Sequence, residues 1–225
     1  MNNTLSVITI DGSAGVGKTT ISRRLAETLH IAYLDTGAMF RCLALKLGEH
    51  AHTLPEHSII EHCHEFEFSI TGTGFTTQLL CNNIPIENEI RTEKVGMLAS
   101  RLGTVPIIRK ILGEIQRKMG ENNSLVAEGR DMGTVIFPDA KFKFFLEATP
   151  EVRALRRMRD QNNIDTNTDL ATLTVQIRQR DALDRNRTIA PLRAATDAMV
   201  IDTSDLNEEE VLGHIINTIN VRGGI

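Results

Sequence analysis

Aromatic residues are scarce in this sequence: they make up 4% of its 225 residues, with no Trp and a single Tyr. A core of ordinary size therefore has to be built from Leu, Ile, Val, Met and Ala. Long hydrophobic runs are absent as well, since no stretch approaches the ~18 apolar residues that a membrane-spanning helix needs. The first residues also lack the charged segment and long apolar run of a secretory signal. We therefore expect no membrane partner and no secretion.

Positive charge is not in excess either, because 25 Lys and Arg face 29 Asp and Glu, for a formal net charge of -4. Proteins that bind DNA or RNA are usually strongly basic, so we expect no nucleic-acid partner. Cysteine is limited to Cys42, Cys63 and Cys81, which show no CxxC spacing. Free thiols of this kind are typical of a reducing compartment. We expect the protein to be cytoplasmic and to act as a monomer.

The apolar residues that are present alternate between strand-like and helix-like spacing. Hydrophobic residues form 41% and charged residues 24% of the chain, the balance of a globular protein. Strands are predicted at residues 5–10, 125–127, 142–146 and 198–201, and residues 31–34 form a short apolar piece before the next helical stretch. Helices are predicted at residues 17–29, 92–102, 107–119, 170–187 and 206–221. Two further helical stretches are predicted, one that ends at residue 47 and one that begins at residue 150. This alternation favours an α/β fold with a mainly parallel sheet.

The hydrophobic pattern changes at residues 65–86. Short segments in which apolar and polar residues alternate are separated there by Gly72, Gly74 and the pair Asn82-Asn83. Glycine and asparagine are the residues that tight turns favour. We therefore predict a small antiparallel meander inserted into the α/β fold. Residues 161–169 are polar and turn-prone, which predicts a surface excursion before the next helix.

Residues 12–19, GSAGVGKT, fit the pattern G-x-x-x-x-G-K-[ST] at every fixed position. The motif lies between a predicted strand and a predicted helix, the context in which it binds phosphate. Its glycines let the backbone wrap around a polyphosphate, and the amide groups at the helix N-terminus face the anion. Lys18 supplies a point charge for the β- and γ-phosphates, and Thr19 offers its hydroxyl to Mg²⁺. The motif predicts binding of a nucleoside triphosphate with magnesium.

The motifs of a switch GTPase are missing: no Gly has an Asp three residues before it, and N-K-x-D is absent. A kinase for a small acceptor needs a second anion site that faces the first. Between Pro150 and Arg193 there are nine Arg and no Lys, and Arg41 and Arg130 lie near predicted turns. The guanidinium fork suits bidentate recognition of phosphate, and its charge is permanent. These arginines favour a small-acceptor kinase.

Several longer stretches resemble the bacterial cytidylate kinases, a family of nucleoside monophosphate kinases. They are distributed from one end of the chain to the other, so the resemblance covers nearly all of it. The matching stretches are residues 7–12, the phosphate loop, 34–38 with Arg41, 89–92, 128–139 and 180–187 with Pro191. The segments GRDMGT at 129–134 and DRNR at 184–187 are specific to this family rather than general features of P-loop proteins.

The resemblance implies a P-loop kinase core with a parallel five-stranded sheet flanked by helices. Residues 1–35 and 120–225 would form this core, with a short lid at about 153–168 that closes over ATP. Residues 36–119 would form a monophosphate-binding domain, and the meander at about 65–86 would be its antiparallel insert. The implied reaction is transfer of the γ-phosphoryl group of ATP to CMP or dCMP, with Mg²⁺ as cofactor.

The resemblance also implies roles for individual residues. The ATP-binding residues would be Gly12, Ser13, Ala14, Gly15, Val16, Gly17, Lys18, Thr19 and Thr20. The substrate-binding residues would be Thr36, Arg41, Ser100, Arg109, Arg130, Asp131, Arg180, Asp184 and Arg187. Among these, Arg41, Arg130 and Arg187 would hold the acceptor phosphate, and Arg180 and Asp184 would contact the sugar. The catalytic residues would be Lys18, Arg130, Arg153 and Arg157, with Arg153 and Arg157 four residues apart on one helix face of the lid.

Cytosine would be recognised by Ser100, Arg109 and Asp131, and its chemistry suits these side chains. Its amino group donates to the carboxylate of Asp131, and its O2 and N3 atoms accept from Arg109 and Ser100. Uracil would place a carbonyl oxygen against Asp131. Because an unpaired buried acceptor costs roughly 1–3 kcal/mol, UMP is disfavoured.

Three residues depart from the pattern that is common in the family. Thr36 stands where Ser is common and keeps the hydroxyl. Phe40 stands where Tyr is frequent and lacks a hydrogen-bonding group. Glu128 stands where Asp is frequent, and its longer side chain would alter metal affinity if the carboxylate organises magnesium through water.

Two alternatives stay open. One is a related kinase for another small acceptor, such as UMP, AMP or shikimate; the other is a nucleotide-binding switch module that hydrolyses its nucleotide slowly. A group of histidines at residues 50–64 with Cys63 contains zinc-ligand types but matches no zinc spacing. We interpret that group as solvated surface.

Overall fold

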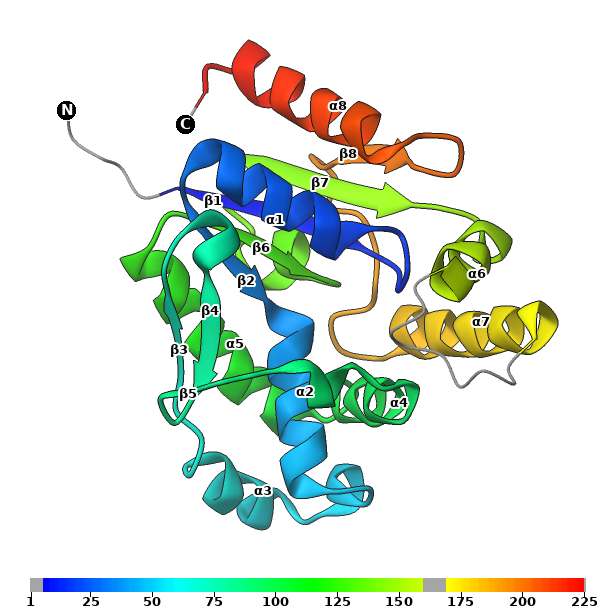
Figure 1. Cartoon of the computed structure of the whole chain (residues 1–225). Helices are drawn as coiled ribbons and strands as arrows, with labels where there is room; N and C mark the ends of the chain where they lie inside the picture. The colour runs from blue at the N-terminus through cyan, green and yellow to red at the C-terminus, as the bar shows by residue number, and fades with distance from the viewer. Residues whose placement is uncertain (1–5, 160–168, 225) are drawn as a thin grey trace.

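The computed structural model describes residues 6–159 and 169–224. Its centre is a five-stranded sheet in which every neighbouring pair is parallel (Figure 1). The strands, in their order across the sheet, are β2 (Ala32–Asp35), β6 (Leu125–Gly129), β1 (Val7–Gly12), β7 (Phe142–Glu147) and β8 (Met199–Asp202). The predicted α/β fold with a parallel five-stranded sheet is confirmed. The four predicted strands lie within a few residues of β1, β6, β7 and β8, and β2 covers most of the short apolar piece at 31–34.

The helices fill the intervals between the strands. They are α1 (Lys18–Leu29), α2 (Thr36–Leu47), α3 (Glu56–Cys63), α4 (Glu93–Leu102), α5 (Pro106–Asn122), α6 (Pro150–Arg159), α7 (Leu170–Asn186) and α8 (Glu208–Val221). Three short 3-10 helices are η1 (Ala51–Thr53), η2 (Gly74–Thr76) and η3 (Asn88–Arg91), and η4 (Met132–Ile136) is a short π-helix, all within the described residues. The prediction did not contain η4, which directly follows the segment of residues 128–131 at the end of β6.

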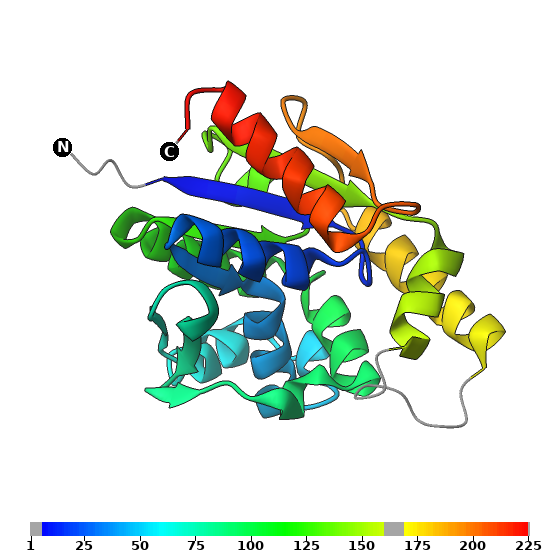
Figure 2. The same ribbon diagram turned by 45° about the horizontal axis from the view of Figure 1, so that its top comes forward.

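The two faces of the parallel sheet pack into two separate cores. Ile8 and Phe144 point to a core that contains residues of α1 and α8. Leu125 and Ala127 point to the opposite core, which contains residues of α2 and α5, whereas Val126 between them belongs to the first core. This alternation is the two-residue repeat of a strand. Figures 1 and 2 show α1 and α8 on one side of the sheet and α5 on the other.

The predicted meander at 65–86 is confirmed as a small antiparallel sheet of β3 (Phe68–Thr71), β4 (Gln78–Cys81) and β5 (Ile84–Pro85). The turn between β4 and β5 consists of Asn82 and Asn83, whose φ angles are 53° and 62°. Asparagine tolerates this left-handed conformation better than most residues. The turn η2 contacts α1, since Phe75 N donates to Glu27 Oε2 at 2.7 Å.

Helix starts follow capping residues in the sequence. The side chains of Asp35, Asp169 and Asn207 each accept a hydrogen bond from a backbone amide in the first turn of the helix that follows. These contacts satisfy amide groups that have no partner inside the helix. Pro150 begins α6, as predicted. The predicted excursion at 161–169 falls largely on residues 160–168, which lie outside the described residues.

The carboxyl ends of β1, β2 and β6 meet at one edge of the parallel sheet, at Gly12, Asp35 and Gly129. Open α/β sheets bind ligands at this edge, where loops from several strands converge. Within residues 6–159 and 169–224, no helix is both long and apolar enough to span a membrane.

Candidate active site

The phosphate loop connects the end of β1 to the start of α1. Gly15 and Gly17 have φ angles of 80° and 92°, a region that favours glycine. Lys18 is the first residue of α1 and is 7% exposed. Its Nζ atom donates to Ser13 O at 2.7 Å, which holds the side chain folded back over the loop. The predicted ATP-binding residues therefore form one compact turn that ends in a helix N-terminus, a site suited to anions.

A cavity of about 700 Å³, here called the loop cavity, lies against this turn. The turn lines it with Ala14, Gly15, Lys18, Thr19 and Thr20. Further side chains complete it. Arg23 comes from α1 itself, and other elements contribute Asp35, Arg41, Arg91, Glu128, Arg130, Arg157 and Arg180. The structure therefore collects cations from five further segments around the phosphate loop.

The buried cations of the loop cavity repel one another. Burial and the neighbouring Arg130 lower the pKa of Lys18 to about 7. Burial, together with Arg130 and Arg41, lowers the pKa of Arg180 to about 9. Opposite charge nearby would favour the charged forms and raise these pKa values again. The cavity is therefore built to receive a polyanion.

A second, smaller cavity of about 60 Å³, here called the arginine cavity, adjoins the first. Its lining includes Thr36, Phe40, Ser100, Arg109, Asp131, Asp184 and Arg187. Gly37, Arg41, Gly129, Arg130 and Arg180 line both cavities. The structure thus brings together all nine predicted substrate-binding residues, and three of their arginines lie between the two cavities.

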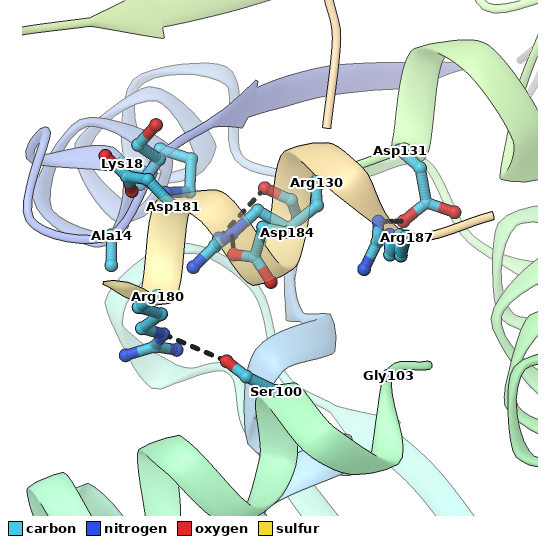
Figure 3. Close-up of polar contacts among 12 residues, drawn as sticks. Ala14, Lys18, Ser100, Gly103, Arg130, Asp131, Arg180, Asp181, Asp184 and Arg187 are labelled. Carbon is cyan, nitrogen blue, oxygen red and sulfur yellow. Dashed lines mark hydrogen bonds and ion pairs between the residues drawn. The ribbon is translucent and has the colours of Figure 1, made fainter. Parts of the chain in front are cut away.

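Ion pairs organise the arginine cavity. Arg109 and Arg187 both pair with the carboxylate of Asp131, and Arg187 Nη2 lies 3.3 Å from Asp131 Oδ1. Arg130 Nε donates to Asp184 Oδ2 at 2.8 Å. Figure 3 shows Arg130 and Asp184 between Lys18 and the Asp131–Arg187 pair. The cavity between these pairs is only about 60 Å³, so a ligand the size of a nucleotide has to displace or widen them.

Arg180 lies on α7 and reaches α4, where its Nε atom donates to Ser100 Oγ at 3.1 Å (Figure 3). Arg41 lies on α2 and donates to Ile90 O at 2.8 Å, and its pKa is lowered to about 10 by burial despite Asp35 nearby. The two guanidinium groups converge over Gly96. If residue 96 carried a side chain, its Cβ atom would lie 3.0 Å from Arg41 Nη2 and 3.2 Å from Arg180 Nη1, so glycine leaves room for both groups.

The two predicted lid arginines differ in their surroundings. Arg153 is 2% exposed and pairs with Asp181, and its Nη1 atom also donates to Ala14 O at 3.0 Å. Arg157 pairs with Glu93 and lines the loop cavity. The structure therefore places Arg157 at the cavity and Arg153 behind the phosphate loop. The remainder of the predicted lid, residues 160–168, lies outside the described residues.

Sequence reasoning did not assign Asp11, the last residue of β1 before Gly12. Its carboxylate accepts hydrogen bonds from Met132 N at 2.9 Å and Gly133 N at 2.8 Å. Asp11 thereby ties the strand before the phosphate loop to η4, the turn that follows Arg130 and Asp131. Burial raises the pKa of Asp11 to about 6, although the two amide hydrogen bonds act in the opposite direction.

Magnesium is the cofactor that the sequence predicts, and the chain offers suitable oxygen atoms for it. Thr19 Oγ1 donates to Glu128 Oε1 at 2.8 Å beside the loop cavity. Glu128 Oε2 is buried and has no hydrogen-bond partner among the described residues. Burial and the nearby Asp35 raise the pKa of Glu128, so a cation beside this carboxylate would favour its charged form. Mg²⁺ prefers such oxygen ligands, often through water, and the residues therefore fit the ion.

Other candidate regions lie away from these residues. A cavity of about 910 Å³ lies between α3, β3 and α5, and apolar side chains such as Ile107, Ile111 and Ile115 line part of it. In the histidine-rich segment, Cys63 is buried and His62 Nδ1 contacts Ser58 O at 2.6 Å. Within the described residues, no group of three or more His, Cys, Asp or Glu side chains is placed to hold a metal ion.

Comparison with known proteins decides the family. Residues 8–221 match the family described as cytidylate kinase. The chain belongs to the cytidylate kinase family. It is 50% identical over 221 residues to the cytidylate kinase of Nitratidesulfovibrio vulgaris, which covers 98% of this chain and 95% of that protein. It is 51% identical over 213 residues to the cytidylate kinase of Oleidesulfovibrio alaskensis, which covers 95% and 97%.

Membership of the cytidylate kinase family makes the chain a phosphotransferase, and the predicted resemblance is confirmed. Among solved structures, a shikimate kinase from Bacteroides thetaiotaomicron has a TM-score of 0.53 at 14% sequence identity and covers 96% of this chain and 99% of that one. This likeness concerns the fold. It confirms the P-loop kinase architecture and does not favour shikimate as the acceptor.

Proposed function

We propose that this cytidylate kinase family member transfers the γ-phosphoryl group of ATP to CMP or dCMP, which gives ADP and CDP or dCDP. The observation that carries the proposal is that two cavities of different character share Arg41, Arg130 and Arg180. One cavity is built around a phosphate loop, and the other contains a buried carboxylate, Asp131, with paired arginines. Cations between two anion sites lower the cost of bringing two phosphates together.

The loop cavity is the proposed site of ATP. Residues Gly12 to Thr20 would wrap the phosphates, and Lys18 would leave Ser13 O to contact the β- and γ-phosphates. Thr19 would bind Mg²⁺ directly and Glu128 would hold its water shell. Bound Mg²⁺ supplies positive charge to the β- and γ-phosphate oxygens. Arg157, which already lines the loop cavity, would add positive charge from the lid side.

The arginine cavity is the proposed site of the nucleoside monophosphate. Arg41, Arg130 and Arg187 would hold its phosphate, and Arg180 and Asp184 its sugar, with Thr36 on the wall beside them. Ser100, Arg109 and Asp131 would read cytosine. Asp131 is 3% exposed, so the hydrogen bond that its carboxylate accepts would be shielded from water. Such shielding makes a mismatched base costly.

The reaction requires alignment rather than acid-base chemistry. A bond forms between an oxygen of the acceptor phosphate and the γ-phosphorus of ATP, and the bond to the bridging oxygen of ADP breaks. The acceptor oxygen is already ionised at neutral pH, so no general base has to remove a proton. The protein has to neutralise charge and exclude water, which would otherwise accept the phosphoryl group.

We further propose the division into parts that the sequence predicts: a core of residues 1–35 and 120–225 with a lid at about 153–168, and a monophosphate-binding domain of residues 36–119. The small volume of the arginine cavity, about 60 Å³, supports a motion of these parts when the acceptor enters. Arg153, buried between Ala14 and Asp181, would couple the lid helix α6 to the phosphate loop.

The cellular setting stays a proposal as well. Cys42, Cys63 and Cys81 are free and buried, which supports the predicted cytoplasmic location. The monomeric state is a prediction that sedimentation of the purified protein would test.

Acceptor choice tests the proposed function directly. ADP formation is measured with CMP, dCMP, UMP, AMP and shikimate in turn, and without acceptor. We expect rapid turnover with CMP and dCMP, weaker turnover with UMP, and slow hydrolysis otherwise. A rate that is independent of the acceptor would favour the switch module, and faster turnover with AMP or shikimate would contradict the proposed substrate.

Asp131→Asn tests the recognition of cytosine. Its amide nitrogen can donate to the carbonyl that uracil carries, so we expect the ratio of kcat/KM for CMP to that for UMP to fall roughly 10- to 100-fold. Asp197→Asn is the matched control, because Asp197 is an exposed carboxylate that pairs with Lys143 away from both cavities. An unchanged ratio in Asp131→Asn would refute the assignment of this residue.

A further inference from the structure

The only tyrosine of the chain, Tyr33, contacts the carboxylate beside the phosphate loop. Its hydroxyl donates to Glu128 Oε1 at 2.6 Å. Thr19 Oγ1 donates to the same oxygen at 2.8 Å, whereas Glu128 Oε2 has no hydrogen-bond partner among the described residues. One oxygen of the carboxylate is therefore held by two hydroxyl groups, and the other is left available.

The backbone places Tyr33 where it can hold Glu128. In the parallel pair of β2 and β6, Tyr33 lies opposite Val126, and Glu128 is two residues further along β6. Residues two apart on a strand point to the same face, so Glu128 shares the α1 face with Tyr33 and Val126, both members of that core. Thr19 stands on the first turn of the same helix. The three side chains are thus diagonal neighbours beneath the phosphate loop.

Tyr33 is itself fixed in place. It is 4% exposed, and the guanidinium carbon of Arg23 lies 5.4 Å from the centre of its ring. Its backbone amide donates to Thr77 Oγ1 at 3.3 Å. A buried ring with one neighbour on its face and a held backbone has little freedom to move its hydroxyl. The contact to Glu128 is therefore a constraint on the carboxylate and not an adjustable surface contact.

We propose that Tyr33 is a positioning residue for the Glu128 carboxylate: its hydroxyl, together with that of Thr19, holds Oε1, and the unpaired Oε2 would serve the water shell of the magnesium ion. The inference rests on the proposed function, in which Thr19 and Glu128 serve the metal. The Glu128 side chain has several rotatable bonds, so its carboxylate can adopt more than one orientation. A second hydroxyl donor offsets this freedom, because partners of this kind orient the groups that serve a metal.

The decisive variant is Tyr33→Phe, which removes the hydroxyl and keeps the ring under Arg23. Binding of Mn²⁺ to the full-length protein saturated with ADP is titrated by electron paramagnetic resonance, with Mn²⁺ as the probe for the divalent cation. We expect Mn²⁺ affinity to fall roughly 10-fold, the usual size for loss of an orienting partner. Affinity for ADP without metal and the KM for CMP are expected to stay unchanged. Ser22→Ala is the matched control, since Ser22 is a buried hydroxyl on α1 without a partner among the described residues.

The double-mutant cycle with Glu128→Gln separates the possible roles. If Tyr33 acts through Glu128, Tyr33→Phe has no further effect on Mn²⁺ affinity in the Glu128→Gln background. Equal losses in both backgrounds, or no loss in Tyr33→Phe while Glu128→Gln weakens Mn²⁺ binding, would overturn the inference and leave the proposed metal site standing. Unchanged Mn²⁺ affinity in Glu128→Gln would overturn the proposed role of Glu128 and the inference with it.

Discussion

The two cavities present positive charge by different physical means. The loop cavity owes its character to nine consecutive residues, 12–20, whose backbone turns into the N-terminus of α1. The arginine cavity has no such continuous segment, because its side chains come from α2, α4, α5, α7 and the chain after β6. A backbone site accepts any nucleotide with a phosphate tail. A site built from scattered side chains can distinguish one base from another, and its assembly depends on the whole fold.

Charge compensation differs in the same way. In the arginine cavity, Arg109 and Arg187 already share Asp131, and Arg130 is paired with Asp184. In the loop cavity, Lys18 has a carbonyl oxygen, Ser13 O, as its hydrogen-bond acceptor. Both cavities keep an excess of positive charge for a ligand to neutralise, but in the arginine cavity three of the five arginines are already paired with its two carboxylates. Paired arginines keep their geometry in the empty protein, which favours selectivity over maximal attraction.

The largest effect should come from Lys18→Ala. We expect kcat to fall on the order of 10³-fold, because a preorganised charge at the transferring phosphoryl group is lost. Thermal stability of the ligand-free protein should not fall, since a buried cation near other cations is removed. Binding of CMP, measured by calorimetry, should be unchanged if the two cavities act as separate sites. Arg24→Ala on the same helix is the control, because Arg24 pairs with Glu209 at the surface.

Arg130→Ala sharpens the same comparison, since Arg130 lines both cavities. Here we expect a comparable loss of kcat, together with weaker binding of CMP and of ATP. Normal turnover in either variant would contradict the assignment of these residues. A loss of CMP affinity in Lys18→Ala would show that the cavities are coupled already in the absence of ATP.

The fold was predictable because its signals are local. Strand segments such as 142–146 carry continuous apolar residues, and cap residues such as Asn207 mark helix starts. The turn η4 was not predictable in this way, because MGTVI is as apolar as a short strand. Its conformation depends on Asp11, 121 residues earlier in the chain, which accepts its first amide groups. Only the folded sheet brings these two segments together.

The same distinction holds for the site. The phosphate loop is a contiguous motif with a physical meaning, so its residues could be read from the sequence. The arginines of the arginine cavity stood out as a set, but the role of each residue came only from resemblance to a family, because no spacing connects Arg109 with Asp131 or Arg187. Tyr33 and Asp11 were missed altogether. Each is a single residue in a strand, and its significance lies in a contact with a distant segment.

Asp11, which ties β1 to η4, makes folding sensitive to pH. Its folded-state pKa of about 6 is above the ordinary value of 3.8, because burial outweighs its two amide hydrogen bonds. The folded state therefore holds this proton between pH 4 and 6 where the unfolded chain loses it. As pH rises through this window, the contribution of Asp11 to the free energy of unfolding should fall by up to about 3 kcal/mol and stay constant above it. Urea unfolding of the protein and of Asp11→Asn at pH 4 to 7 measures this contribution as their difference.

Asp202→Asn provides a control of opposite sign. Asp202 is fully exposed, and hydrogen bonds from Ser204 lower its pKa. Its stabilising contribution should therefore be present near neutral pH and be lost as pH falls. A difference for Asp11→Asn that does not change between pH 4 and 6 would show that the carboxylate is ionised throughout. The two hydrogen bonds that Asp11 accepts from η4 would then offset the cost of burying its carboxylate.

The smallest effect should come from Phe40, which lines the arginine cavity. The guanidinium carbon of Arg109 lies 5.8 Å from the centre of its ring. Such a contact contributes roughly 0.5–1 kcal/mol at a partly exposed site. Phe40→Leu should therefore raise the KM for CMP about 2- to 5-fold, because Arg109 loses part of its support, while the KM for ATP stays constant. Phe40→Tyr keeps the ring and should not raise the KM for CMP. If Phe40→Leu leaves that KM unchanged, Asp131 alone orients Arg109, and the selectivity of the arginine cavity depends on its ion pairs without help from the aromatic ring.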